Sequence, residues 1–271
     1  MFGMKIGVFC NRATPRFVSV QKNLLTIFRR SGICHEVYES VESIGDVDVL
    51  VVLGGDGTIL KVAIEAGRRG IDLLGINAGN LGFLTQFEGE QAEEAAELLM
   101  HPYETEPRSV LEVQVGADRY YALNDALFQR HYTAEADNNV VSVTAEIDGK
   151  KVDEFVGDGI IISTPTGSTA YSLSAGGSVL TPDLSAFILT PVCAHSLHNR
   201  PIVYNDSRTM RILRGAEGNV LSLYCDGRYV CDPPAGAEIF LRKADFSVRF
   251  VKPKDSNFFD KLLFKLNKWS R

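Results

Sequence analysis

The sequence contains few cysteines and no paired-cysteine motif. Five cysteines are scattered along the 271 residues, and no two of them are spaced as C-x-x-C: Cys10, Cys34, Cys193, Cys225 and Cys231. An odd number of isolated cysteines indicates neither a disulfide framework nor a zinc site. We therefore expect reduced thiols and a cytoplasmic location.

A membrane-spanning run and a leader segment are also lacking. The longest uncharged stretch, Gly159–Pro182, is rich in Ser, Thr, Gly and Pro, which does not suit a membrane span. Met1–Cys10 runs directly into strand-like residues, without the pattern of a signal peptide. We expect a soluble protein with no membrane partner.

Positive charge is not in excess. The chain has 28 Lys and Arg against 34 Asp and Glu, which gives a net charge of −6. This balance argues against nucleic acid as a partner. With 45% hydrophobic residues, the chain can bury a sizeable core in one large or two modest domains.

Three common functional signatures are absent. The sequence has no G-x-G-x-x-G of a dinucleotide fold, no Gly-Lys-Ser/Thr Walker loop and no G-x-S-x-G hydrolase elbow. His195 and His198 stand three residues apart, but no third His or Cys clusters with them. We therefore expect no metal held by these side chains.

The most informative motif that is present is Gly-Gly-Asp-Gly-Thr at residues 54–58. It follows the apolar run Val49–Leu53 and precedes a helix-like stretch. A strand that breaks at glycines and restarts as a helix presents free backbone N–H groups, which bind anions such as phosphate. A carboxylate at Asp56 suits this place if it accepts a hydroxyl proton or holds a magnesium ion, and both point to phosphoryl transfer. The alternative is that Asp56 only caps the helix.

Strand-like and helix-like segments alternate over the first hundred residues. This alternation predicts a doubly wound, Rossmann-like parallel sheet, whose ligands bind beyond the carboxyl ends of the strands. Gly54–Thr58 and a second glycine-rich turn, Gly75–Gly82, follow two such ends. We expect strands at Lys5–Cys10, Val49–Leu53 and Ile71–Leu74, and helices at Phe17–Arg30, Thr58–Arg69 and Gln91–Met100.

From Arg108 onward the sequence is rich in short β segments, which predicts a mainly antiparallel all-β domain. The expected strands are Ser109–Gly116, Tyr120–Arg130, Val140–Ile147, Val152–Phe155, Gly159–Ser163, Phe187–Thr190, Thr209–Leu213, Val220–Cys225, Glu238–Arg242 and Phe246–Val251.

The chain ends in an amphipathic segment, Asn257–Trp269. Its apolar face is expected to contain Phe258, Leu262, Leu263 and Leu266. The predicted organisation is an α/β domain at 1–105, a β-rich domain at 106–252 and a helical tail at 253–271.

A second constellation lies at residues 157–177. Asp158 precedes the apolar strand Gly159–Ser163, and a dense group of hydroxyl residues with Tyr171 follows it. Hydroxyl groups, exposed N–H groups and a stacking ring suit a nucleoside, although a hydroxyl-capped turn explains them as well. Asn124-Asp125 is a polar pair within an apolar segment and marks a strand end or a ribose contact. Asp226-Gly227 is most simply a turn.

Taken in order, these motifs closely resemble the NAD kinase family. The residues that carry the resemblance are Gly54–Thr58, Gly75-Ile-Asn-x-Gly-x-Leu-Gly-Phe83, Asn124-Asp125, Asp158-Gly159, Ser163-Thr-Pro-Thr-Gly-Ser-Thr-Ala-Tyr171 and Thr190-Pro-x-Cys-x-His195. The first of them is shared with diacylglycerol kinases and phosphofructokinases. The run ending at Tyr171, together with the Asn-Asp pair, is highly specific.

The resemblance implies transfer of the γ-phosphoryl group of ATP to the 2′-hydroxyl of the NAD adenosine ribose, giving NADP. It implies that Asp56 approaches that hydroxyl, that Phe83 lies against the adenine, and that Asp158 contacts the nicotinamide-side nucleoside. It also implies that the tail returns to the first domain. The full set of binding residues implied is Gly57, Thr58, Lys61, Phe83, Asn124, Asp125, Asp158, Thr166, Thr169, Ala170, Tyr171, Ser174, Asp226 and Arg228.

Mg²⁺ is the cofactor expected, bound with the nucleotide. NAD and ATP, or polyphosphate, are the expected ligands. The resemblance also implies a homodimer or homotetramer in which a neighbouring chain completes the pocket. Two positions depart from the family pattern: Val156 replaces a basic residue common in relatives, and Arg228 follows Asp226-Gly227 where relatives have residues such as Gln. The alternatives are a lipid or sugar kinase that shares the first motif, and a non-catalytic NAD(P)-binding sensor.

Overall fold

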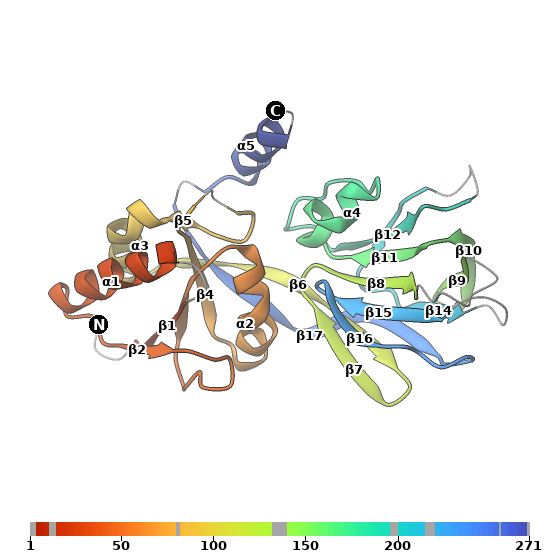
Figure 1. Ribbon diagram of the computed structural model, residues 1–271, viewed down its shortest axis with the longest axis horizontal. Helices are drawn as coiled ribbons and strands as arrows, with labels where there is room; N and C mark the ends of the chain where they lie inside the picture. The colour runs from red at the N-terminus through yellow and green to blue at the C-terminus, as the bar shows by residue number, and fades with distance from the viewer. Residues whose placement is uncertain are drawn as a thin grey trace. The chain divides into compact units, whose positions relative to one another are not determined.

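The computed structural model describes residues 4–10, 15–79, 82–131, 140–195, 200–214, 220–254 and 256–269 (Figure 1). The chain forms two compact units, Met1–Arg108 with Ser247–Arg271, and Ser109–Phe246. Each unit has its own hydrophobic core.

The first unit is built on a parallel sheet. β3 lies between β1 and β4, and all five of its side chains are buried, as expected for a continuous apolar run with helices on both faces. Figure 1 shows α1 and α3 on one side of this sheet and α2 on the other. The strands are β1 (Ile6–Cys10), β2 (His35–Tyr38), β3 (Val49–Leu53), β4 (Asp72–Asn77) and β5 (Phe87–Glu88), and the helices are α1 (Pro15–Arg30), α2 (Asp56–Arg69), η1 (Gly89–Gln91), α3 (Ala92–Leu99) and α5 (Phe258–Trp269).

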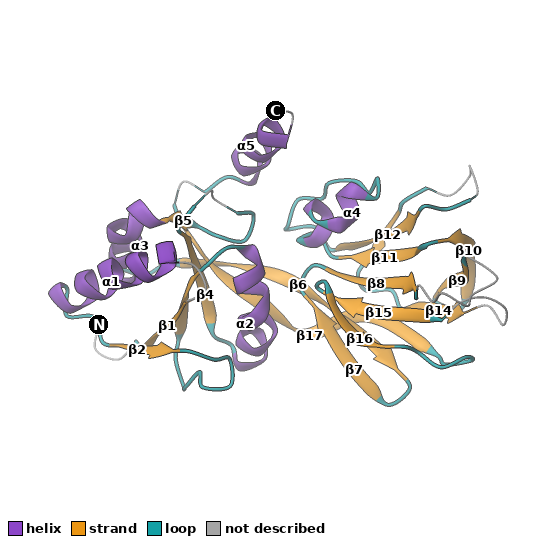
Figure 2. Ribbon diagram, in the orientation of Figure 1, coloured by secondary structure: helices purple, strands orange, loops and turns teal. Residues whose placement is uncertain are grey.

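The second unit contains two antiparallel sheets whose inner faces share one core (Figure 2). One sheet has the order β13-β12-β11-β8-β15-β16, and the other contains β10, β9, β14, β17, β6 and β7. The strands are β6 (Glu104–Val115), β7 (Asp118–Ala122), β8 (Asp125–Arg130), β9 (Val141–Ile147), β10 (Lys150–Gly157), β11 (Gly159–Ser163), β12 (Ala186–Val192), β13 (Ile202–Asn205), β14 (Met210–Arg214), β15 (Leu221–Cys225), β16 (Arg228–Cys231) and β17 (Ile239–Lys252). The short helices η2 (Gly167–Thr169) and α4 (Tyr171–Ser174) follow β11.

The predicted fold class is confirmed: an α/β part with a parallel sheet, an antiparallel all-β part and a C-terminal helix. Many element boundaries differ from the expected ones, and the strands β2, β5, β13 and β16 were not predicted. Three of the differences are as follows. α2 begins at Asp56 rather than at Thr58, because Gly55 is its N-cap. The segment expected as one strand at Tyr120–Arg130 is two, β7 and β8. The two strands expected at the end of the β-rich part are a single long strand, β17.

The inward face of α5 also differs from the expectation. Leu263 is 62% exposed, whereas Phe258 stacks against Phe83 with ring centroids 6.5 Å apart. Lys261 and Lys265 lie on the same side as Phe258, because residues three and seven positions apart share a helix face. Leu266 lies outside the residues whose side chains are described. Within the described residues, no helix combines the length and the apolar character that crossing a membrane requires.

Candidate active site

Asp56 is held by a second loop rather than serving as a helix cap. It is the first residue of α2, and its carboxylate accepts two backbone hydrogen bonds, from the N–H of Phe83 at 2.9 Å and from that of Leu84 at 3.0 Å. One N–H binds each carboxylate oxygen, so the rotation of the group is fixed. The capping interpretation of Asp56 is therefore wrong, and the two glycine-rich turns meet at this carboxylate.

Glycine is required where these turns meet. A Cβ on Gly82 would lie 1.9 Å from Oδ1 of Asp56, which no side chain can tolerate. A Cβ on Gly54 would lie 2.4 Å from the Thr58 side chain, so the strand end could not pack against the first turn of α2. The glycines thus let Asp56 and Thr58 approach the neighbouring backbone closely.

The loop at residues 82–85 is fixed by further bonds. Gly82 donates its N–H to Oγ1 of Thr85 at 2.7 Å, and Thr85 is completely buried. The carbonyl of Thr85 accepts a hydrogen bond from Nζ of Lys261 at 2.8 Å. Phe83 is partly buried between Phe258 and Lys265, whose Nζ lies 6.0 Å from its ring centroid. Residues from α5 therefore support the loop that orients Asp56.

Lys261 is a titratable group that the sequence analysis did not select. Burial and the charge of Arg108 lower the pKa of Lys261 to about 8, while Asp56 and Glu106 act in the opposite direction. A lysine flanked by Phe258, Leu262 and Lys265 at helical spacing was the signal available in the sequence.

In the second unit, Asn124 lies against the hydroxyl-rich loop. Its carbonyl accepts hydrogen bonds from the N–H of Thr164 at 2.9 Å and from Oγ of Ser163 at 3.3 Å. A Cβ on Gly167 would lie 2.1 Å from that same carbonyl, so only glycine permits this approach. The structure thus brings Asn124 together with the loop that contains Thr166 and Thr169, both of which are buried.

Asp226 fixes the backbone around Asn124. Its Oδ2 accepts the N–H of Leu123 at 2.9 Å, and its Oδ1 accepts those of Asn124 at 2.7 Å and Asp125 at 3.2 Å. The expected turn at Asp226-Gly227 is present, since both residues have positive φ, 49° and 73°. Asp226 therefore positions the Asn-Asp pair through its backbone.

Asp125 is a buried carboxyl group. Burial is the main cause that raises the pKa of Asp125 to about 7, and the neighbouring charge of Asp226 adds to it. The pKa of Asp226 is also raised by burial, opposed by its three backbone hydrogen bonds. Arg228 is exposed on β16, and its charge acts on Asp226 in the lowering direction.

Asp158 lies apart from Asn124 within the second unit. It stands at the beginning of β11, whereas Ser163, at the other end of that strand, pairs with Asp125. The two ends of β11 are separated by roughly 15 Å at the usual strand rise. A guanidinium nitrogen of Arg130 lies 3.1 Å from Oδ1 of Asp158, an ion pair that the sequence analysis missed. Val156 is exposed on the adjacent β10.

The remaining predicted residues lie at the surface of their own unit. Tyr171 is 40% exposed, and the neighbouring Ala170 is partly buried. Gly57, Lys61 and Ser174 are exposed.

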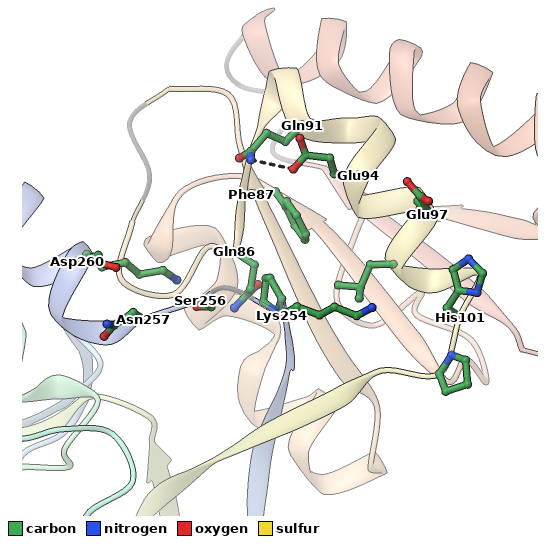
Figure 3. A pocket seen from close by; sticks show the side chains of 14 residues that line it. Gln86, Phe87, Gln91, Glu94, Glu97, His101, Lys254, Ser256, Asn257 and Asp260 are labelled. Carbon is green, nitrogen blue, oxygen red and sulfur yellow. Dashed lines mark hydrogen bonds between the residues drawn. The ribbon is translucent and has the colours of Figure 1, made fainter.

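The first unit contains a pocket of about 570 Å³ (Figure 3). It extends from α3 to the segment preceding α5, and Gln91 donates a hydrogen bond to Glu94 at its rim. Of the residues named above, Lys261 lines it, whereas none of the predicted site residues does.

The first unit has a parallel sheet with a glycine-flanked carboxylate at a helix N-terminus. The second unit is all-β and has a hydroxyl-rich turn of the kind that suits a nucleoside. These features are typical of a nucleotide-dependent phosphotransferase. Comparison with known proteins gives the family. Residues 12–104 match the ATP-NAD kinase N-terminal domain, and residues 129–253 match the ATP-NAD kinase C-terminal domain. The chain belongs to the NAD kinase family.

The sequences of individual relatives match this chain over most of its length. An NAD kinase of Caldicellulosiruptor bescii is 34% identical over 97% of this chain and 99% of its own length. An NAD kinase of Leifsonia xyli is 40% identical over 81% of this chain and 73% of its own.

Two solved structures share the fold. Yeast NADH kinase, crystallised with NADH, has a TM-score of 0.84 at 26% identity and covers 98% of this chain and 87% of its own. An Archaeoglobus fulgidus NAD kinase in complex with ATP has a TM-score of 0.82 at 28% identity, covering 97% of this chain and 99% of its own.

Proposed function

We propose that the protein is an NAD kinase that transfers the γ-phosphoryl group of ATP to the 2′-hydroxyl of the adenosine ribose of NAD. Asp56 orients that hydroxyl and accepts its proton, and the N-terminus of α2 binds phosphate oxygens through Gly57 and Thr58. Asn124, Asp125 and the loop containing Tyr171 bind the nucleoside portions of NAD. The observation that carries this proposal is the Asp56 carboxylate, fixed by two N–H groups at a helix N-terminus.

The two alternative functions, a lipid or sugar kinase and a non-catalytic sensor, require different features of the chain. A lipid or sugar kinase needs the first motif alone, whereas both halves of this chain match the NAD kinase family. A non-catalytic sensor does not need an oriented carboxylate beside a phosphate-binding helix end. Incubation with Mg-ATP and NAD, followed by detection of NADP, distinguishes the three. A panel that replaces ATP by polyphosphate and NAD by NADH defines donor and acceptor, and absence of NADP from every combination would reject the proposal.

Substitution of the proposed nucleoside contacts is expected to weaken NAD binding. Tyr171→Ala and Asn124→Ala should chiefly raise the KM for NAD, because these side chains contact the substrate equally in the ground and transition states. Steady-state kinetics with NAD varied at saturating ATP measures this, and Tyr229→Ala, at an exposed tyrosine of β16, is the control. An unchanged KM in both variants would place the NAD pocket elsewhere.

Mg²⁺ is proposed to arrive with the phosphates of the nucleotide. Within the described ranges, no three His, Cys, Asp or Glu side chains gather closely enough to enclose a metal ion. Both oxygens of Asp56 already accept backbone N–H groups. Mg²⁺ keeps several waters and takes its other ligands from substrate phosphates in such sites. Calorimetric titration should show weak Mg²⁺ binding to the free protein and tight binding with ATP present, and a tight site without nucleotide would contradict this.

A homodimer or homotetramer is proposed as the active form. Asp158 and Asn124 lie at opposite ends of β8 and β11, and this separation within one chain supports a pocket that Asp158 of a neighbouring chain completes. Of the segment 191–201, Val192 is buried, and Leu197 and His198 lie outside the described residues. Light scattering should give a multiple of 29.8 kDa. Mixed Asp56→Asn and Asp158→Asn subunits should regain activity after exchange, and a fully active monomer would refute the proposal.

The cytoplasm is proposed as the compartment. All five cysteines are free thiols, which is the state that a reducing compartment maintains.

A further inference from the structure

Lys261 contacts the loop that holds Asp56. The loop donates the N–H groups of Phe83 and Leu84 to Asp56, and the next residue, Thr85, accepts a hydrogen bond from Nζ of Lys261 at 2.8 Å. One short segment therefore joins the ammonium group to the carboxylate. A displacement of Thr85 would move both N–H groups that set the rotation of Asp56.

The partial burial of Lys261 costs free energy unless its ammonium group makes favourable contacts. Its side chain is partly buried, and burial disfavours the charged form of a lysine. Phe259, Leu263 and Phe264 of α5 remain exposed, so the contact of Lys261 with Thr85 does not serve to bury these apolar side chains.

The charges around Lys261 come from two elements. Asp56 at the start of α2 and Glu106 on β6 favour the ammonium form, whereas Arg108 on β6 disfavours it. Arg108 is itself paired with Glu106 at 2.9 Å. Of these charges, that of Asp56 belongs to the proposed site. The ammonium group of Lys261 would offset the repulsion between Asp56 and an incoming phosphate chain.

Resting on the proposed function, we infer that Lys261 is a positioning residue for phosphoryl transfer: its ammonium group holds Thr85, and through it the loop that orients Asp56. The hydrogen bond from a charged amine is stronger than that from a neutral one. Loss of the proton weakens the hold on Thr85 and removes the offset to Asp56, and both effects lower kcat.

The first test is the pH profile of kcat. In the wild type, kcat should decline above about pH 8, where Lys261 loses its charge. Lys261→Met should lower kcat about tenfold at pH 7 and abolish that decline, while the KM for NAD stays within about twofold. Lys254→Met, at an exposed lysine preceding α5, is the matched control. An unchanged kcat in Lys261→Met, or an alkaline decline at the same pH in both proteins, would overturn the inference.

A second test applies if Lys261→Met folds poorly. Ethylammonium chloride should restore part of kcat to Lys261→Ala, because the added amine can occupy the vacated position, whereas sodium chloride of equal ionic strength should not. Circular dichroism of both variants reports folding, and no recovery with a folded Lys261→Ala would also refute the role. A wild-type protein that forms no NADP would reject the proposed function, whereas an active wild type with a fully active Lys261→Met would reject only this inference.

Discussion

Asp56→Asn is expected to lower kcat by about 10²–10⁴, the usual contribution of a general base, while NAD still binds. The amide cannot accept the hydroxyl proton, yet it keeps the size of the carboxylate. One amide oxygen can still accept a single N–H group from the loop at Phe83 and Leu84, which limits the structural change. Single-turnover kinetics with saturating ATP and NAD measures the effect on the chemical step directly.

The matched control for Asp56→Asn is Glu65→Gln. Glu65 lies on the same helix, and its ion pair with Arg69 is a long one, 3.8 Å, so Glu65→Gln should leave kcat unchanged. Equilibrium binding of NAD to both variants separates loss of chemistry from loss of the pocket. If Asp56→Asn keeps a kcat near that of the wild type, the carboxylate serves only to hold the loop and the proposed mechanism fails.

Asp226→Ala is expected to destabilise the second unit by about 3 kcal/mol and to lower the thermal midpoint by roughly 10 °C. The substitution removes the acceptor for three backbone N–H groups and places alanine at a positive φ. Loss of negative charge beside Asp125 offsets a smaller part of this cost. Thermal unfolding followed by circular dichroism measures the change.

Two control variants separate the causes of this destabilisation. Asp226→Asn tolerates the positive φ, and its amide oxygen can keep the bonds to Asn124 and Asp125, so it should lose far less stability. Asp148→Ala introduces alanine at nearly the same φ, 50°, in an exposed Asp-Gly turn. It also removes an ion pair with Arg208 and a hydrogen bond from the N–H of Thr209, so its cost is an upper limit for the backbone strain. Destabilisation by Asp226→Ala that is no larger than that by Asp148→Ala would contradict a large contribution from the three hydrogen bonds of Asp226.

Local patterns predicted the elements on which the site is built. Val49–Leu53 is an uninterrupted apolar run that ends at two glycines, so strand, turn and helix follow from residue type alone. The strand Gly159–Ser163 has the predicted bounds, because its three isoleucines stand between a glycine and a serine. The tail helix was predicted with the wrong inward residue, because the periodicity of α5 fits more than one face when Phe, Leu and Lys alternate.

The contacts that orient the site could not be predicted from local patterns. Asp56 binds a loop 27 residues further along, and Asp226 binds backbone groups about a hundred residues before it. A side chain that binds backbone N–H groups leaves no signature in the partner's sequence, since every residue except proline offers the same donor. The contact of Lys261 with Thr85 is hidden for the same reason, because its acceptor is a carbonyl group.

The buried carboxyl group of Asp125 makes the second unit exchange protons near neutral pH. In the unfolded chain this proton is lost near pH 4, whereas the folded chain keeps it to about pH 7, so the stability that the group contributes falls between these values and is constant above them. Both protonation states of Asp125 are therefore populated near neutral pH. A ligand that prefers either form must therefore take up or release a fraction of a proton on binding, and the heat of NAD binding becomes dependent on the ionisation enthalpy of the buffer.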